Sequence, residues 1–154
     1  MKVQGEYFLP LHQQASWDLL LNTEVLSRAM PGCQGLVPIG PDEYEMKMKV
    51  VISSIQGLFE GKVRIAEKDP PSSYRLFIEG QGKLGFVNGN GVLTLNPDPA
   101  GAKVSFTGDV QVGGLVATVG ERMLDMTTKM MIKRFFNALT QEAESLAGAK
   151  NPNL

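Results

Sequence analysis

The chain has 154 residues and a mass of 16.7 kDa, the size of one domain with a real hydrophobic core. Hydrophobic residues make up 43%, and 15 basic residues nearly balance 16 acidic ones, which argues against a disordered chain and against bulk-charge binding of nucleic acid. A single Cys excludes an intramolecular disulfide, and no apolar run approaches the ~20 residues of a membrane span. The composition therefore predicts a soluble cytoplasmic domain, and the N-terminus does not resemble a signal peptide.

The first part of the chain predicts one strand and two short helices. Residues 2–9 alternate between polar and apolar side chains, as a strand does, and a proline follows them. Residues 12–21 predict a short helix, and Asn22 with Thr23 can cap a second helix that runs to Met30. The Pro-Gly pair after Met30 is expected to end this helix.

A run of about six antiparallel strands is predicted from residue 43 onward, because apolar and polar side chains alternate there. The side chains expected on the inner face of these strands are Tyr44, Met46, Met48, Val50, Ile52, Gly61, Val63, Ile65, Tyr74, Leu76, Ile78, Val104, Phe106, Val110 and Val112. Residues 88–91, with the sequence Asn-Gly-Asn-Gly, predict a bulge or tight turn before a strand at 92–95. Residues 115–147 then predict one helix of ~45–50 Å.

These elements predict an α+β domain in which a curved antiparallel sheet of about seven strands wraps around a long C-terminal helix, with two short helices after the first strand. This is the helix-grip fold, because a long terminal helix can cover the one apolar face of such a sheet. We expect residues 1–147 to form this single domain and residues 148–154 to form a frayed tail. An apolar space is expected between the sheet and the helix.

The long helix carries two apolar stripes when it is plotted at 100° per residue. The broad stripe, expected to face the core, consists of Leu124, Met131, Ile132, Phe135, Leu139, Ala143 and Leu146. The second stripe consists of Val119, Met123, Met126 and Met130. It forms either a core or dimer contact or the lip of a pocket or docking surface, since Met suits adaptable binding surfaces. Arg122, Lys129 and Lys133 form a basic edge beside it, which is either a solvated face or a contact for a membrane surface or acidic partner.

Residues that carry catalysis in other proteins are sparse in this chain. The single His, His12, lies at a strand–helix junction and is expected to be a surface or capping residue. Cys33 follows the Pro-Gly turn without an activating neighbour and is expected to be a small buried apolar group. Residues 80–85 match GxGxxG, but no helix is predicted after them, so these glycines are expected to bend the sheet. We therefore predict no catalytic residue, no metal site and no cofactor.

Several segments together resemble a known family. They are Trp17-Asp18-Leu19-Leu20, Ala29-Met30-Pro31-Gly32-Cys33, Gly57-Leu58-Phe59-Glu60-Gly61-Lys62-Val63, Pro70-Pro71 leading to Ile78-Glu79-Gly80-Gln81-Gly82, and Val112-Gly113-Gly114-Leu115-Val116-Ala117-Thr118-Val119-Gly120-Glu121-Arg122. In their order and spacing they resemble the carbon monoxide dehydrogenase CoxG family of the START-like, polyketide-cyclase-like (SRPBCC) superfamily, over residues 2–147.

This resemblance implies a helix-grip fold with a hydrophobic cavity. It also implies an accessory role beside a molybdenum hydroxylase of the carbon monoxide dehydrogenase type, with membrane recruitment of that enzyme and handling of a lipophilic quinone. Longer members carry a C-terminal extension that can attach to a membrane, whereas this sequence stops at Leu154. At most transient contact with the inner face of the membrane is therefore expected, and a homodimer stays open.

Three hypotheses for function follow. The first is a non-enzymatic carrier of an isoprenoid quinone or lipid, whose pocket has the Val119, Met123, Met126 and Met130 stripe as its lip or docking face. The residues expected to line this pocket are Met46, Met48, Val50, Leu76, Ile78, Phe106, Leu124, Met131 and Phe135. The alternative is a cyclase or hydrolase acting on an apolar substrate in the same cavity, which requires Tyr44, Tyr74, Arg75 or Glu79 to point inward. The third is a purely structural protein with a collapsed core and a large apolar patch buried by a partner.

Overall fold

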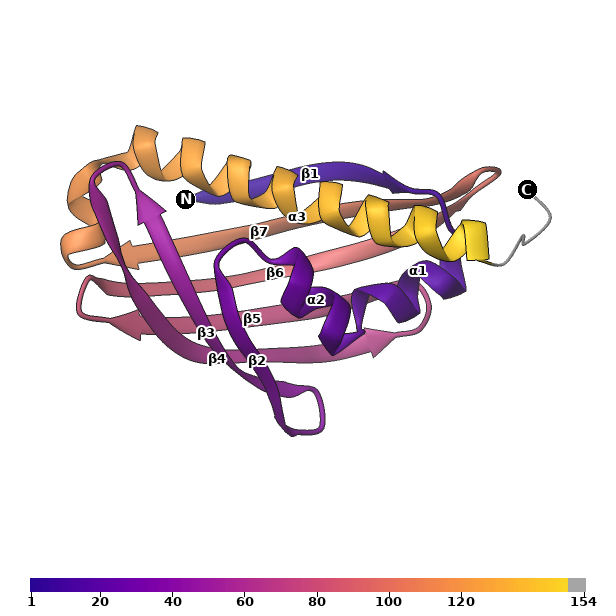
Figure 1. The fold of residues 1–154 in the computed structure, drawn as a ribbon, viewed down its shortest axis with the longest axis horizontal. Coiled ribbons are helices and arrows are strands. Elements are labelled where there is room, and N and C mark those ends of the chain that lie inside the picture. Colours follow the sequence, from indigo (N-terminus) through magenta and orange to yellow (C-terminus); the bar gives the residue numbers. More distant parts are fainter. Residues whose placement is uncertain (150–154) are drawn as a thin grey trace.

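The computed structural model describes residues 1–149 as one antiparallel sheet with helices on one of its faces (Figure 1). The elements are β1 (Lys2–Leu9), α1 (Gln13–Leu20), α2 (Thr23–Ala29), β2 (Cys33–Gly40), β3 (Glu43–Ile52), β4 (Ile55–Asp69), β5 (Ser73–Gly82), β6 (Gly85–Asp98), β7 (Gly101–Gly113), the 3₁₀ helix η1 (Leu115–Val119) and α3 (Glu121–Ala149). The predicted first strand and the two short helices are confirmed. Asn22 caps α2 by accepting a hydrogen bond from the backbone N–H of Val25 at 3.2 Å.

The sheet has seven strands in the order β1-β7-β6-β5-β4-β3-β2. Strands β2 to β7 are joined as successive hairpins, and β1 completes the sheet by pairing with β7. In Figure 1, β2 and β3 cross the direction of β5, β6 and β7, and β4 bends from the one direction to the other, which shows the curvature of the sheet. The predicted α+β helix-grip architecture is therefore confirmed.

The alternation of apolar and polar residues in the sequence matches the alternation of buried and exposed side chains along the strands. In β3, Met46 and Met48 are buried, whereas Glu45 and Lys47 are exposed. The same alternation holds through β4 and β7, so one face of the sheet is apolar and turned toward the helices.

The core consists of two clusters at opposite ends of this inner face. The larger cluster joins α1, α2, the second half of α3 and the sheet; its buried members are Leu9, Leu11, Trp17, Leu19, Leu20, Val25, Ala29, Ile65, Tyr74, Leu95, Val104, Phe136, Leu139 and Ala143. An aromatic stack closes its inner side, since the ring of Tyr7 lies 4.2 Å from that of Phe136 and 6.1 Å from that of Phe106. The smaller cluster is built on Ile52, Phe59 and Val116.

Two predictions about the strands are wrong. Residues 88–91 form neither a bulge nor a turn, because they lie inside β6 and pair with both β5 and β7. The turn lies earlier, at the two-residue loop of Lys83 and Leu84, where Gly82 pairs with Gly85. Cys33 is not a turn residue, since it begins β2, a strand that the sequence pattern does not locate.

The predicted helix over 115–147 is also corrected. Its first turn is the separate 3₁₀ helix η1, and Gly120 then adopts a φ of +94°, which breaks the chain direction before α3 begins. At the other end, α3 continues to Ala149, so residues 148 and 149 are helical rather than part of a tail. The remaining residues of the expected frayed tail, 150–154, lie outside the described residues.

Candidate functional site on the inner face of the sheet

The structure places the nine expected pocket-lining residues in three groups. Val50 and Leu124 pack on the smaller cluster. Leu76, Phe106 and Phe135 pack against the larger cluster. The members that belong to neither cluster are Met46, Met48, Ile78 and Met131.

These four residues lie in a zone between the clusters, which we call the central zone. Its floor is a row of paired inner-face residues across β4 to β7: Val63 pairs with Ile78, Ile78 with Gly89, and Gly89 with Val110. No member of this row belongs to either core cluster, and each is partly exposed although it faces the helix layer. These four floor residues are therefore less buried than the buried members of the two clusters, whereas Met46 and Met48 in the same zone are buried.

The long helix crosses this zone as a cover. Its backbone approaches the sheet most closely at β1 and β3, on either side of the central strands. From its first half, α3 turns Thr127, 8% exposed, and the partly buried Met131 inward. The central strands β4 to β7 lie between these two places of closest approach in the order of the sheet.

Glycines remove side chains from the middle of the inner face. Gly80 and Gly89 face the helix layer, yet a Cβ placed on either would meet only atoms of neighbouring strands within 4 Å, and none from α3. Other inner-face glycines permit the curvature itself: a Cβ on Gly61 would collide with the carbonyl oxygen of Glu79 on the next strand. Gly61 thus permits the close approach of β4 and β5, and Gly80 and Gly89 leave two inner-face positions without a side chain.

The polar groups inside the domain are neutral. In the described part of the chain, the buried polar side chains besides tyrosine are Ser16, whose hydroxyl donates to the Leu11 carbonyl at 2.9 Å, and Thr127. The ring of Tyr74 is buried edge-on against Trp17, and this burial raises the pKa of the Tyr74 hydroxyl well above its ordinary value.

The residues that the enzyme alternative requires divide between the two faces. Tyr44 and Tyr74 point inward, but both belong to the larger cluster rather than to the central zone. Arg75 binds Glu67 at 2.8 Å on the other face, and Glu79 is exposed. Of the four candidate residues, the two tyrosines therefore point inward, whereas Arg75 and Glu79 do not.

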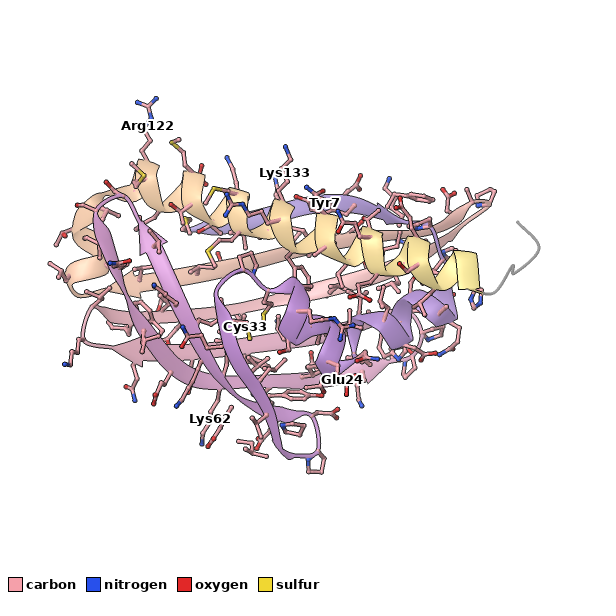
Figure 2. The ribbon with its side chains drawn as sticks, viewed as in Figure 1. Tyr7, Glu24, Cys33, Lys62, Arg122 and Lys133 are labelled. Carbon is pink, nitrogen blue, oxygen red and sulfur yellow. The ribbon has the colours of Figure 1, made fainter. Side chains whose placement is uncertain are left out.

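The expected lip stripe is split by the structure. Val119 and Met123 turn inward and pack on the smaller cluster. Met126 and Met130 face outward and are 57% and 42% exposed. Figure 2 shows Arg122 and Lys133 pointing away from the sheet on the same outer side of α3. Lys129 forms an ion pair with Asp125, one helical turn earlier, at 2.8 Å.

Two surface depressions lie away from the central zone. One, of about 330 Å³, lies between α2 and α3 beside the ion pair of Arg28 with Glu142 at 3.0 Å, which raises the pKa of Arg28. The other, of about 420 Å³, lies beside Met1, Lys2 and Arg122. Both are open, and most of their lining residues are charged or polar.

The other residues considered as candidates from the sequence, His12 and Cys33, are also placed by the structure. The imidazole Nδ1 of His12 accepts a hydrogen bond from the backbone N–H of Ala15 at 3.3 Å, so His12 is the expected capping residue of α1. Cys33 is partly buried and pairs with Met48. Within residues 1–149 there is no group of three or more His, Cys, Asp or Glu side chains placed to hold a metal ion. No helix in the same range combines the length and apolar composition needed to cross a membrane.

Comparison with known proteins identifies the family. The family model for CoxG, a subunit of carbon monoxide dehydrogenase, matches residues 5–144. The chain belongs to the CoxG family. The resemblance stated from the sequence segments is thereby confirmed. No curated protein sequence matches the chain significantly.

Solved structures show the fold that this CoxG-family chain shares. A conserved protein from Geobacillus kaustophilus is 30% identical, with a TM-score of 0.90 over 94% of this chain and 96% of that one. A START superfamily protein from Mycobacterium smegmatis is 14% identical, with a TM-score of 0.71 over 94% and 98% of the two chains. The Zhui aromatase/cyclase from Streptomyces sp. R1128 is 11% identical, with a TM-score of 0.66 over 94% and 93%. The START-like fold is thus shared by proteins that are named for different roles.

Sequence reasoning missed part of the central zone. Val63 and Val110 are predicted on the correct face but not among the lining residues, and Thr127 is in neither helical stripe. Gly89 is predicted in a turn. The signal for Gly89 is present in the sequence, because the polar residues Asn88 and Asn90 alternate with glycines at the period of a strand.

Proposed function

We propose that this CoxG-family chain is a non-enzymatic carrier that binds an apolar small molecule, an isoprenoid quinone or a lipid, between α3 and the central strands. The observation that supports it is the partly exposed row of Val63, Ile78, Gly89 and Val110, which lies under a helix but outside both core clusters. Side chains that face a helix layer and still retain exposure can gain apolar contact from a ligand.

The chemistry of the central zone favours a neutral ligand. Its floor is aliphatic or glycine, its walls include Met46, Met48 and Met131, and Thr127 is its buried hydroxyl. A charged ligand would lose its hydration without gaining a counter-ion there. Methionine side chains adapt to irregular apolar shapes, which suits a flexible isoprenoid or acyl chain.

Family membership extends the proposal to a partner. Within the CoxG family we propose that the chain carries its ligand for, or recruits, a molybdenum hydroxylase of the carbon monoxide dehydrogenase type. Carriage of a lipophile also needs transient contact with the membrane in which the lipophile dissolves, and we propose a cytoplasmic protein that makes such contact at the inner membrane face.

Ligand binding is tested on the purified full chain. Organic-solvent extraction followed by mass spectrometry is expected to release a quinone or lipid, and isothermal titration with a short-chain quinone is expected to show saturable binding. A medium-chain alkylamine serves as the charged control and is expected to bind more weakly. Absence of any extracted lipophile, together with no saturable binding of quinone, fatty acid or phospholipid, would contradict the proposal.

A further inference from the structure

The outer side of the first half of α3 carries a feature that the ligand site does not use. At 100° per residue, five exposed side chains fall within about 100° of the helix circumference. We call them the basic strip: Arg122, Met126, Lys129, Met130 and Lys133. Figure 2 shows Arg122 and Lys133, near its two ends, projecting from the helix away from the sheet.

Charge is segregated on this segment. Residues 122–141 contain four cationic side chains, since Arg134 borders the strip, and Asp125 as their one carboxylate. Asp125 lies at the flank and binds Lys129 at 2.8 Å. The whole chain has a formal net charge of −1, so this helix face is positive on a molecule that is otherwise negative. Such a face is oriented toward anionic surfaces by the field of the whole protein.

The apolar members of the basic strip point to the kind of partner. Met126 and Met130 are 57% and 42% exposed in the middle of the cations, on the convex surface of a single helix. The strip carries no aromatic side chain. Protein interfaces usually concentrate binding in aromatic or Arg anchors that fill pockets. Flexible apolar side chains flanked by Lys and Arg instead suit the boundary between headgroups and acyl chains.

We propose that the basic strip of α3 is a docking surface for a bilayer of anionic lipid. The cations bind the phosphate groups, while Met126 and Met130 enter the interface. Thr127 and Met131 lie on the inner side of the same helix, so α3 stands between the docked bilayer and the central zone. This inference rests on the proposed function in one respect, because it names the surface used for the membrane contact proposed there. Docking itself does not require a bound ligand.

Vesicle co-sedimentation of the full chain tests the proposal. Vesicles of phosphatidylcholine mixed with phosphatidylglycerol are expected to bind the protein about tenfold more tightly than phosphatidylcholine alone, and added salt is expected to reduce the difference. The variant Arg122→Glu with Lys133→Glu is expected to lose this preference. Met126→Gln with Met130→Gln is expected to weaken binding while keeping the preference for anionic vesicles.

A matched control carries the same charge change elsewhere. Lys62 on β4 and Lys83 in the turn after β5 are exposed, and Lys62 lies across the molecule from the basic strip in Figure 2. Lys62→Glu with Lys83→Glu is expected to bind anionic vesicles like the unmodified chain. Equal binding to both vesicle types would overturn the proposal, and so would an equal loss of binding in the control variant. Binding to neither vesicle type would also overturn it, and is the result expected if the strip binds an acidic protein instead.

Quinone titration of the same variants separates this proposal from the carrier function. The Arg122→Glu with Lys133→Glu variant is expected to retain the quinone affinity of the unmodified chain, because the strip faces away from the central zone. Vesicle docking without any ligand binding would contradict the carrier function alone. Ligand binding without a vesicle preference would contradict the docking surface alone.

Discussion

The phenol of Tyr74 is an ionisable group held inside the larger cluster, where its ring is 6% exposed and lies 5.6 Å from that of Trp17. Burial raises the pKa of Tyr74 because the phenolate would lose its hydration. In the unfolded chain the group titrates near its ordinary pKa of about 10. The unfolded state therefore releases this proton at a lower pH than the folded state does.

This difference predicts an alkaline loss of stability. Below pH about 10 both states hold the proton, and the contribution of Tyr74 is fully present. As the pH rises above that value, the unfolded state gains free energy from ionisation that the folded state does not, so the free energy of unfolding falls. Urea denaturation at a series of alkaline pH values measures the slope. Tyr74→Phe is the control and is expected to show a shallower decline; an identical decline in both proteins would contradict the assignment.

Gly61 shows how one missing side chain sets the shape of the sheet. A Cβ at this position would collide with the Glu79 carbonyl of β5, so Gly61→Ala forces the two strands apart. We expect Gly61→Ala to lower the free energy of unfolding by about 1–3 kcal/mol, as overpacked sites do. Chemical denaturation checks this value.

Gly35 provides the matched control for this substitution. It lies on β2, and nothing comes within 4 Å of a Cβ built on it. Gly35→Ala is expected to be neutral or to stabilise by up to about 1 kcal/mol through the entropy of the unfolded chain. Equal destabilisation by the two substitutions would show that the close approach of β4 and β5 is not what requires glycine at position 61.

At the scale of elements, α3 buries different sides along its length. In its first half Thr127 is the buried residue, whereas Phe136, Leu139 and Ala143 are buried farther along, on a side rotated by roughly a third to a half of a turn. A single straight stripe, as the sequence predicts, cannot follow this rotation. For this reason Leu146, which the sequence places in the core, is exposed, and Phe136, which lies outside the predicted stripe, is buried.

Two leucines on α3 test this rotation. Leu139 is 0% exposed and Leu146 is 42% exposed. Leu139→Ala is expected to cost about 2–5 kcal/mol of unfolding free energy, because it leaves a cavity in the larger cluster. Leu146→Ala makes the same chemical change and is expected to stay within about 0.5 kcal/mol. Similar losses for both, measured by urea denaturation, would contradict this packing of α3.

The strands show where sequence patterns suffice and where they fail. Alternation locates β3 correctly because its outer face is charged and its inner face is apolar. It misses β2, where Pro38 and two glycines weaken the pattern on an edge strand. Asn-Gly repeats favour turns locally, but in β6 the pairing with strands on both sides overrides that preference. Tertiary pairing, which no local pattern contains, decides these segments.

At the scale of the whole molecule, the site depends on how the sheet bends beneath the helix. The sequence predicts which side chains face inward, and Met46, Met48, Ile78 and Met131 are expected in the pocket on that basis. It does not predict which inward residues the two clusters enclose. That division follows from the curvature of β2 to β4 and the path of α3, both of which are set by contacts distant in sequence.

The proposed ligand site can be tested by a substitution on its floor that the fold can accommodate. A Cβ at Gly89 meets its nearest atoms at 3.7 Å, an ordinary contact distance, and it points toward the helix layer. A leucine there would extend from the floor into the space beneath α3. We expect Gly89→Leu to reduce quinone affinity by about tenfold, equivalent to ~1.4 kcal/mol, because the added side chain takes the place of ligand atoms. Titration calorimetry with a short-chain quinone measures this change.

Asn90→Leu is the control, since the next residue of β6 is exposed on the opposite face of the sheet. It adds a leucine to the same strand outside the central zone and is expected to leave quinone affinity unchanged. Thermal denaturation of both variants is expected to give midpoints within a few degrees of the unmodified chain. An unchanged affinity in a folded Gly89→Leu protein would show that the ligand lies elsewhere, because a molecule occupying the room above Gly89 cannot share it with the added leucine side chain.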